Sequence, residues 1–169
     1  MNQPTVYKNY FENYTSLVAD KNIKEVFANQ QQTLEDFLNK ITEQQAIFSY
    51  APDKWSLKEM LQHIIDTERI FNYRAMCISR KETVTLPGFD ENVYAQNSFA
   101  NERTWLDLSH EMKILRENTI LLFNSFTENM LHQTGNFSSA NASVQTIGLI
   151  IAGHLYHHKN IAEERYLQL

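Results

Sequence analysis

Histidines at helical spacing are the residues of this sequence with the clearest capacity for chemistry. His154 and His158 are four residues apart, so on a helix they lie about 40° apart on one face. His63 lies on the same face as Met60 and Ile70 of a separate segment. The face of His154 also carries apolar residues, namely Ile147, Ile150, Ile151 and Ile161. The sequence therefore predicts three imidazoles that point inward from two helices.

Three inward imidazoles require partners, because a buried polar group without one costs about 1–3 kcal/mol. His154, His158 and, from a facing helix, His63 could hold one divalent ion about 2 Å from each ring nitrogen. Three neutral ligands would leave positions open for water or substrate, which is typical of a catalytic site. The alternative is a set of core histidines that bond backbone carbonyls or carboxylates, and spacing alone leaves both interpretations open.

Charged residues near His63 suggest further roles. Glu59 and Asp66 lie about one turn on either side of it, where either could accept its ring N–H or pair with a neighbouring basic side chain. Arg74 lies on the same face, about three turns further along. It is predicted to bind an anionic group of a substrate or to form an internal salt bridge.

The sequence excludes two familiar classes of metal site. In the segment HLYHH, Leu155 stands where a zincin has the glutamate of H-E-x-x-H. The chain contains no E-x-x-H, the motif of the di-iron carboxylate bundles. His110 and His132 lie in polar stretches and are expected to be exposed, and His157 falls at the margin of the apolar stripe.

Composition and charge narrow the class of protein. Four glycines and three prolines among 169 residues are too few for the turns of an all-β fold. A single cysteine excludes an internal disulfide and a thiolate zinc site. The net charge of −5 gives no electrostatic support for binding nucleic acid. Without a signal peptide or membrane span, we expect a soluble, cytoplasmic protein with no membrane partner.

Helical periodicity predicts four long amphipathic helices, over residues 23–41, 56–80, 104–126 and 143–167. Asn22 with Glu25 is the expected N-cap of the first helix, and Ser56 with Glu59 is the capping box of the second. Thr119 interrupts the apolar stripe of the third. These elements predict an all-α fold formed by one domain over residues 1–169, namely an antiparallel four-helix bundle or a close variant of it.

The segments outside these helices differ in length and character. Residues 81–103 are too many for a simple turn, and they predict a long crossover between the second and third helices that could carry function. Residues 127–141 are expected to form a short helix and a polar loop, without strands. Residues 1–20, which include Tyr7, Tyr10 and Tyr14, are expected to add a short helix packed on the bundle.

Two motifs and one loop resemble those of a known family. The motifs W-S-x-x-E-x-x-x-H and G-H-x-x-H-H begin at Trp55 and Gly153, and the loop is LPGFDENVY. In order and spacing they resemble the DinB-like superfamily of metal-binding four-helix proteins, and especially its YfiT-like branch of metal-dependent hydrolases. The resemblance covers essentially the whole chain.

The resemblance implies a divalent ion, zinc or nickel, held by His63, His154 and His158. It also implies a homodimer that acts on a small-molecule substrate. Members of the wider superfamily include transferases that use bacillithiol, mycothiol or glutathione, and a maleylpyruvate isomerase. A low-molecular-weight thiol is therefore an expected cosubstrate, whereas no catalytic residue and no organic cofactor is identified.

The chain departs from the family pattern at Leu155, because many YfiT-like members have glutamate directly after the first histidine of the terminal motif. One interpretation is a metal-dependent enzyme that transfers a thiol to an electrophile or hydrolyses a small substrate. The alternative is a metal-binding stress-response protein without catalytic activity, which the absence of that glutamate favours. A third interpretation, an interaction bundle with structural histidines, requires that no metal binds.

Overall fold

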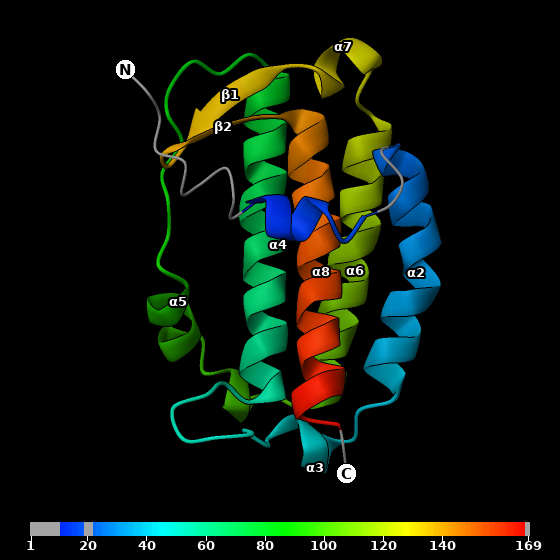
Figure 1. Cartoon of the computed structure of the whole chain (residues 1–169), viewed down its shortest axis with the longest axis vertical. Helices are drawn as coiled ribbons and strands as arrows, with labels where there is room; N and C mark the ends of the chain where they lie inside the picture. Colours follow the sequence, from blue (N-terminus) through cyan, green and yellow to red (C-terminus); the bar gives the residue numbers. More distant parts are fainter. Residues whose placement is uncertain (1–10, 19–21, 168–169) are drawn as a thin grey trace.

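Four long helices form the body of the protein (Figure 1). The computed structural model describes residues 11–18 and 22–167. The long helices are α2 (Ile23–Asn39), α4 (Leu57–Ser79), α6 (Trp105–Asn124) and α8 (Val144–Arg165). The predicted capping box of Ser56 and Glu59 is confirmed, since each side chain accepts a hydrogen bond from the other residue's backbone N–H. Each helix begins close to its predicted start.

Each long helix packs against two others. α4 packs against α6 and α8, and α2 packs against the same two helices. Figure 1 shows that α4 and α6 run in one direction while α2 and α8 run in the other. The all-α four-helix bundle is therefore confirmed, and the parallel pair α4 and α6 explains why a long connection must join them.

The connection between α4 and α6 returns along the length of the bundle (Figure 1). Within it, Leu86 pairs with Phe137 in an isolated parallel bridge, and α5 (Glu91–Asn97) packs against α4. Asp90 begins α5 by accepting hydrogen bonds from backbone N–H groups of its first turn. A 3-10 turn, η1 (Ala100–Glu102), then leads to α6. The predicted crossover is confirmed, and it holds the start of α5 beside α4.

One prediction is wrong in the segment before α8. α7 (Glu128–Leu131) is the expected short helix, but the expected polar loop is a β-hairpin of β1 (Thr134–Phe137) and β2 (Ala140–Ser143). Gly135 and Phe137 are buried while their neighbours in β1 are exposed. A strand with so few large apolar residues gives little signal of period two. The antiparallel register pairs Thr134, Gly135, Asn136 and Phe137 with Ser143, Ala142, Asn141 and Ala140.

Two shorter helices complete the described structure. α3 (Glu43–Ala46) joins α2 to α4, and residues 11–15 form a short helix that crosses α4 and α8 in Figure 1. The short N-terminal helix is therefore present, while Tyr7 and Tyr10 lie outside the described residues. Among the residues that the structure describes, no helix has both the length and the apolar character needed to cross a membrane.

The interior of the bundle has an apolar region toward each end and a polar layer between them. Arg116 donates two hydrogen bonds to Glu68, at 2.9 and 2.8 Å, and a third to Gln30. Gln30 donates to the backbone carbonyl of Ala152 (2.9 Å), and Thr119 donates to Glu68 (2.6 Å). The layer thus links all four long helices. The apolar region on one side of the layer includes Phe27, Phe123 and Ile147. The region on the other side includes Leu38, Leu61 and Leu108.

Candidate metal centre

Three buried histidines from α4 and α8 meet in the structure. Nε2 of His154 lies 3.0 Å from Nε2 of His63 and 3.0 Å from Nε2 of His158. His63, His154 and His158 are 9%, 5% and 8% exposed. One ligand atom from each ring lies within 4.8 Å of the other two. The structure therefore brings together the three residues that the helical faces singled out.

The positions of the histidines follow from helix geometry. His154 and His158 are one turn apart on α8, and His63 lies opposite them because α4 and α8 pack side by side. Gly153 lets the short N-terminal helix approach α8, since a Cβ atom there would lie 2.0 Å from the carbonyl oxygen of Tyr14. The Tyr14 ring consequently packs edge-on against His154, with 5.3 Å between ring centroids.

Burial keeps the three imidazoles neutral. It lowers the pKa of His63 from its ordinary value of 6.5 to about 4. It also lowers the pKa of His154 and His158 well below 6.5, and the neighbouring histidines add to this effect. Trp55 contributes to the apolar surroundings, because its ring centroid lies 4.9 Å from that of His63. Neutral imidazoles retain the lone pair that a metal ion requires.

The nitrogen positions fit a divalent ion better than a hydrogen-bond network. A neutral imidazole nitrogen either donates or accepts, so Nε2 of His154 cannot serve both neighbours well. Ligands about 2.0–2.1 Å from a tetrahedral ion lie roughly 3.3 Å apart, close to the 3.0 Å observed. Nδ1 of His158 is buried without a hydrogen-bond partner in the described part of the chain. The donor set is therefore suited to a divalent cation.

The carboxylates beside His63 in the sequence have other partners. Asp66 accepts a hydrogen bond from Gln62 (2.9 Å) and lies 4.0 Å from the guanidinium of Arg69. Glu59 accepts the backbone N–H of Ser56 in the capping box. Asp66 therefore takes the pairing role that was one alternative for it. Within the described part of the chain, Glu59 takes neither of its two predicted roles, because its carboxylate caps the N-terminus of α4.

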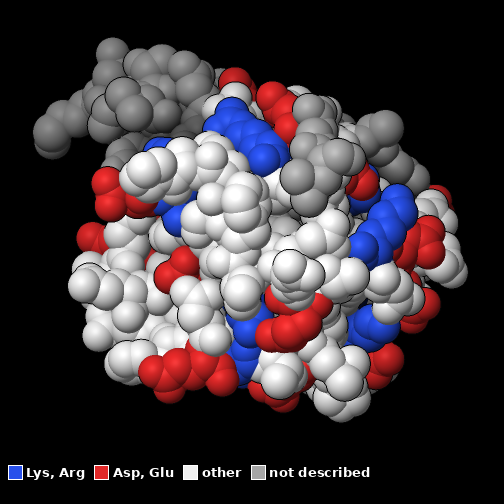
Figure 2. Space-filling view, turned by 90° about the horizontal axis from the view of Figure 1, so that it is seen from below, with Lys and Arg blue, Asp and Glu red and all other residues white. Residues whose placement is uncertain are grey.

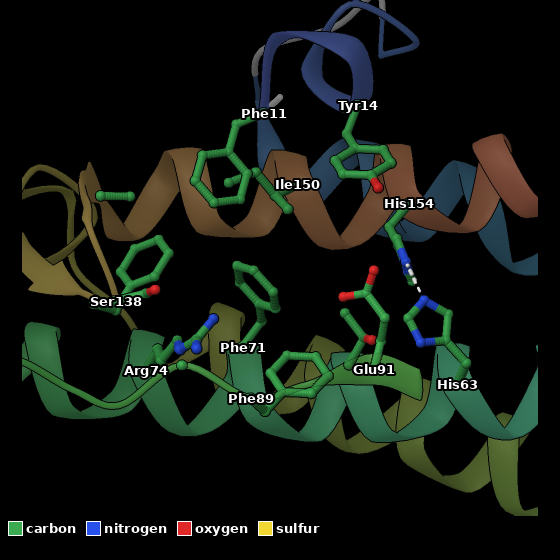
Figure 3. Close-up of a pocket in the computed structure, with 14 residues that line it drawn as sticks. Phe11, Tyr14, His63, Phe71, Arg74, Phe89, Glu91, Ser138, Ile150 and His154 are labelled. Atoms are coloured by element: carbon green, nitrogen blue, oxygen red, sulfur yellow. Dashed lines mark hydrogen bonds between the residues drawn. The ribbon is translucent and has the colours of Figure 1, made fainter. Parts of the chain in front are cut away.

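A carboxylate that the sequence did not reveal faces the histidines. Glu91 is the first residue of α5, and its side chain points toward His63 and His154 in Figure 3. It lines the same cavity as these two histidines. Leu155, where the family resemblance leads to the expectation of glutamate, is 1% exposed and packs in the apolar core. The signals for Glu91 were its place after the helix-capping residue Asp90 and its position within the loop LPGFDENVY.

Two cavities reach the three-histidine centre. The first, here called the aromatic cavity, has a volume of about 130 Å³ and is lined by His63, His154 and Glu91 among others. The second, the polar cavity, has a volume of about 240 Å³ and is lined by His158 and Asn92 among others. Since Glu91 and Asn92 are consecutive residues, the start of α5 separates the two cavities.

The other histidines and Arg74 occupy different surroundings. His110 and His132 are exposed, as predicted, and His157 is half-buried with its ring centroid 5.3 Å from that of Tyr14. Arg74 is buried and lines the aromatic cavity. None of the ion pairs among the described residues includes Arg74. Within that part of the chain, the internal salt bridge that was one alternative for Arg74 is therefore wrong.

Comparisons with known proteins identify relatives of this fold. A family model described as the DinB superfamily matches residues 27–162, which include all three clustered histidines. Among solved structures, YfiT from Bacillus subtilis is similar with a TM-score of 0.71 and 14% sequence identity, over 97% of this chain and 90% of that chain. YfiT is described as a probable metal-dependent hydrolase with an unusual four-helix bundle topology. No curated protein gives a significant match.

Proposed function

We propose that this chain, which belongs to the DinB superfamily, is a divalent-metal-dependent enzyme that acts on small molecules. The observation that carries the proposal is the convergence of three buried imidazoles: Nε2 of His154 lies 3.0 Å from Nε2 of His63 and 3.0 Å from Nε2 of His158. Each of two cavities is lined by at least one of these histidines. The ligands would be His63, His154 and His158, and zinc or nickel is the expected ion. When bound, such an ion lowers the pKa of a coordinated water or thiol and polarises an electrophile.

Residues around the centre supply other requirements of catalysis. The carboxylate oxygens of Glu91 are placed to accept a proton from a water or thiol that reacts beside His63 and His154. The Tyr14 and Trp55 rings pack on His154 and His63 and limit the access of bulk water. Glu91 would therefore supply the carboxylate that Leu155 does not.

Transfer of a low-molecular-weight thiol to an electrophile is the reaction class that we propose first. A transfer reaction needs room for two small molecules, and two cavities lined by different ligand histidines offer that room. A polar thiol suits the polar cavity beside His158, and an apolar electrophile suits the aromatic cavity. Hydrolysis, which needs only one organic substrate, is the second reaction class.

A screen of the metal-loaded protein tests this proposal. Bacillithiol, mycothiol and glutathione would each be offered with the electrophile monochlorobimane, and a panel of small esters and amides would be offered without a thiol. We expect metal-dependent conjugation with one of the thiols, and its loss in a His154→Ala variant. Ester or amide hydrolysis without conjugation would assign the second reaction class. Absence of metal-dependent turnover across both panels would contradict an enzymatic role.

The alternative function is a metal-binding stress-response protein of the same fold without catalytic activity. The observation that favours it is Leu155, which is buried in the core and provides no carboxylate. This alternative predicts stoichiometric metal binding and no turnover in either panel. It also predicts that replacing Glu91 affects metal binding at most, because there is no turnover to change.

A further inference from the structure

The aromatic cavity has a buried cation at the end away from the histidines (Figure 3). Arg74 is 4% exposed and follows His63 on the same helix, α4. The eleven helical steps from His63 to Arg74 correspond to about 16 Å of helix and return to nearly the same face, about 20° away. The cavity therefore joins the three-histidine centre to a guanidinium group.

The surroundings of Arg74 leave its charge without an anionic partner. Its Cζ atom lies 4.8 Å from the ring centroid of Phe71, 4.7 Å from that of Phe137 and 5.9 Å from that of Phe89. Its Nη2 donates to the carbonyl of Pro87 (2.8 Å), and no carboxylate among the described residues pairs with it. A guanidinium has five N–H donors, so most remain for a ligand. Aromatic faces stabilise the cation but do not neutralise it.

The charge of Arg74 persists at neutral pH, and a hydroxyl lies at the same end of the cavity. Burial lowers the pKa of Arg74 to about 10, which is still far above neutral. Ser138 lines the cavity and lies at the end occupied by Arg74 in Figure 3. The backbone N–H of Ser138 donates to the carbonyl of Leu86 (2.8 Å), which fixes the hairpin turn against the crossover. The Ser138 hydroxyl therefore offers a second donor for an anion.

The middle of the cavity is apolar and has room for one small group. Its volume of about 130 Å³ is close to that of cavities of about 150 Å³ that accommodate benzene. An apolar group of this size removes its surface from water without requiring hydrogen bonds. The apolar wall is formed by Phe11, Phe71, Phe89, Phe137 and Ile150.

We infer that the aromatic cavity binds a small carboxylic acid in its ionised form. Its carboxylate would bind Arg74, and an apolar body about the size of one ring would lie against Phe71 and Phe137. A carboxylate matches the guanidinium because two parallel N–H donors bind its two oxygens. A phosphate monoester carries a charge of about −1.5 to −2 at pH 7, which exceeds the single positive charge of Arg74. One part of this inference rests on the proposed function, namely that a reacting group of the bound acid would reach His63 and His154.

Binding measurements with matched acids and amides test this inference. Benzoate and phenylacetate would be compared with benzamide and phenylacetamide by titration calorimetry, on the zinc-loaded protein and on the chelator-stripped protein. In the stripped protein no metal contact can hold the carboxylate. We expect each acid to bind roughly ten-fold or more tightly than its amide, because a charge-assisted hydrogen-bond pair forms only with the acid.

Substitutions at Arg74 of α4 and at Arg80, the residue that follows α4, supply the matched variants. Arg74→Met removes the charge but keeps an apolar side chain, so it should abolish the preference for the acid and leave amide binding unchanged. Arg80→Met makes the same change at an exposed arginine, and it should keep the wild-type preference. Arg74→Lys retains the charge and should keep part of the preference, which provides a second variant if Arg74→Met does not fold.

Several results would overturn the inference without touching the metal site. They are equal affinities of acid and amide for the wild-type protein, a preference that survives Arg74→Met, or no binding of either acid at about 10 mM. Because binding to the stripped protein does not depend on turnover, failure of the carboxylate site and failure of the proposed enzymatic function give different results.

Discussion

At the scale of single residues, burial decides which chemistry each histidine can perform. His63, His154 and His158 are at most 9% exposed and are neutral at pH 7, so their lone pairs are available to a metal ion. His110 and His132 carry the same ring but are exposed to water. The difference arises from where each residue lies in the fold, not from its type.

We predict that the metal-free protein loses stability as the pH falls below about 6.5. The unfolded chain binds a proton at His63 with the ordinary pKa of 6.5, whereas burial lowers the pKa in the folded protein to about 4. The stability associated with the neutral ring is therefore complete above pH 6.5 and is lost as the pH falls toward 4. The loss for this residue is about 3 kcal/mol, and urea unfolding at a series of pH values measures it.

Two matched variants serve as controls for this pH dependence. His63→Gln should weaken this pH dependence, because one of the three buried titrating rings is gone while His154 and His158 remain. His110→Gln makes the same change at an exposed histidine, and its stability should depend on pH as that of the wild type does. Equal pH dependence in all three proteins would contradict a buried, neutral His63.

We predict that Glu91→Gln lowers kcat by about 100-fold or more while the metal content stays unchanged, since general acid–base groups contribute about that much. The amide keeps the shape of the side chain but cannot accept the proton. Glu102→Gln makes the same change at an exposed carboxylate of η1 and should keep wild-type activity. Steady-state kinetics with the active thiol or ester provide the measurement, and an unchanged kcat in Glu91→Gln would remove Glu91 from the mechanism.

At the scale of elements, the contact between the short N-terminal helix and α8 closes one side of the metal centre. It depends on Gly153, because a Cβ atom there would lie 2.0 Å from the Tyr14 carbonyl oxygen and 2.5 Å from its carbon. The neighbouring residue, His154, packs against the Tyr14 ring. A single small residue thus couples the covering helix to a ligand position.

We predict that Gly153→Ala displaces residues 11–18 from α8 but preserves the metal ligands, which lie on α4 and α8. Limited proteolysis should cut near Tyr14 faster than in the wild type, and the metal content should remain the same. The variant serves as its own control, since only one of the two measurements should change. Unchanged proteolysis would show that the covering helix does not need the glycine, and loss of metal would show that it supports the ligands.

The polar layer between the two apolar regions joins the four long helices. We predict that Glu68→Gln destabilises the protein by about 3–5 kcal/mol, because Arg116 is 1% exposed and would lose the only counter-charge that it has among the described residues. Glu163→Gln, which breaks the partly exposed ion pair with Lys159 on the surface of α8, should cost less than about 1 kcal/mol. Urea unfolding of both variants at pH 7 makes the comparison, and similar losses for the two would contradict the structural role of the layer.

Helix faces could be predicted from the sequence because they depend on a fixed local period. The inward positions of His63, His154 and His158 follow from the turn of the helix, and the start of α4 follows from the side chains of Ser56 and Glu59. The pairing of Glu68 with Arg116 could not be predicted, since their contact joins distant segments and depends on how α4 packs against α6.

Features without a helical or strand period in the sequence could not be predicted. The hairpin over residues 134–143 has few large apolar side chains, and its pairing with the crossover at Leu86 is non-local. Glu91 lies at the start of α5, whose position depends on the path of the crossover past α4. Sequence therefore predicted the cluster of three histidines, whereas the carboxylate and the two cavities required the structure.

At the scale of the whole molecule, the bundle does not depend on the metal for its core. Apolar clusters fill both ends of the bundle, and the histidines are only one part of the interior between them. Charges of both signs lie next to one another on the end of the molecule in Figure 2. The buried Lys58 of α4 pairs with Glu43 of α3 (2.5 Å). The fold is therefore expected to persist when the ion is removed.

We predict that chelation leaves the helical circular dichroism intact but lowers Tm, because an ion that binds only the folded state stabilises it by mass action. Restoring zinc or nickel should restore Tm in the wild type and not in His154→Ala. A protein that unfolds outright on chelation would contradict this view of the core.

The homodimer that the family resemblance implies remains a separate prediction, which light scattering of the metal-loaded protein checks.

Metal content per chain tests the central claim most directly. The wild-type protein and a His63→Ala/His154→Ala/His158→Ala variant would be loaded with zinc or nickel, dialysed and measured by elemental mass spectrometry. A His110→Ala/His132→Ala variant controls for exposed histidines. We predict one ion per chain in the wild type and in the control, and essentially none in the triple variant. A wild-type protein that retains no ion, or a triple variant that retains a full equivalent, would contradict the three-histidine metal centre.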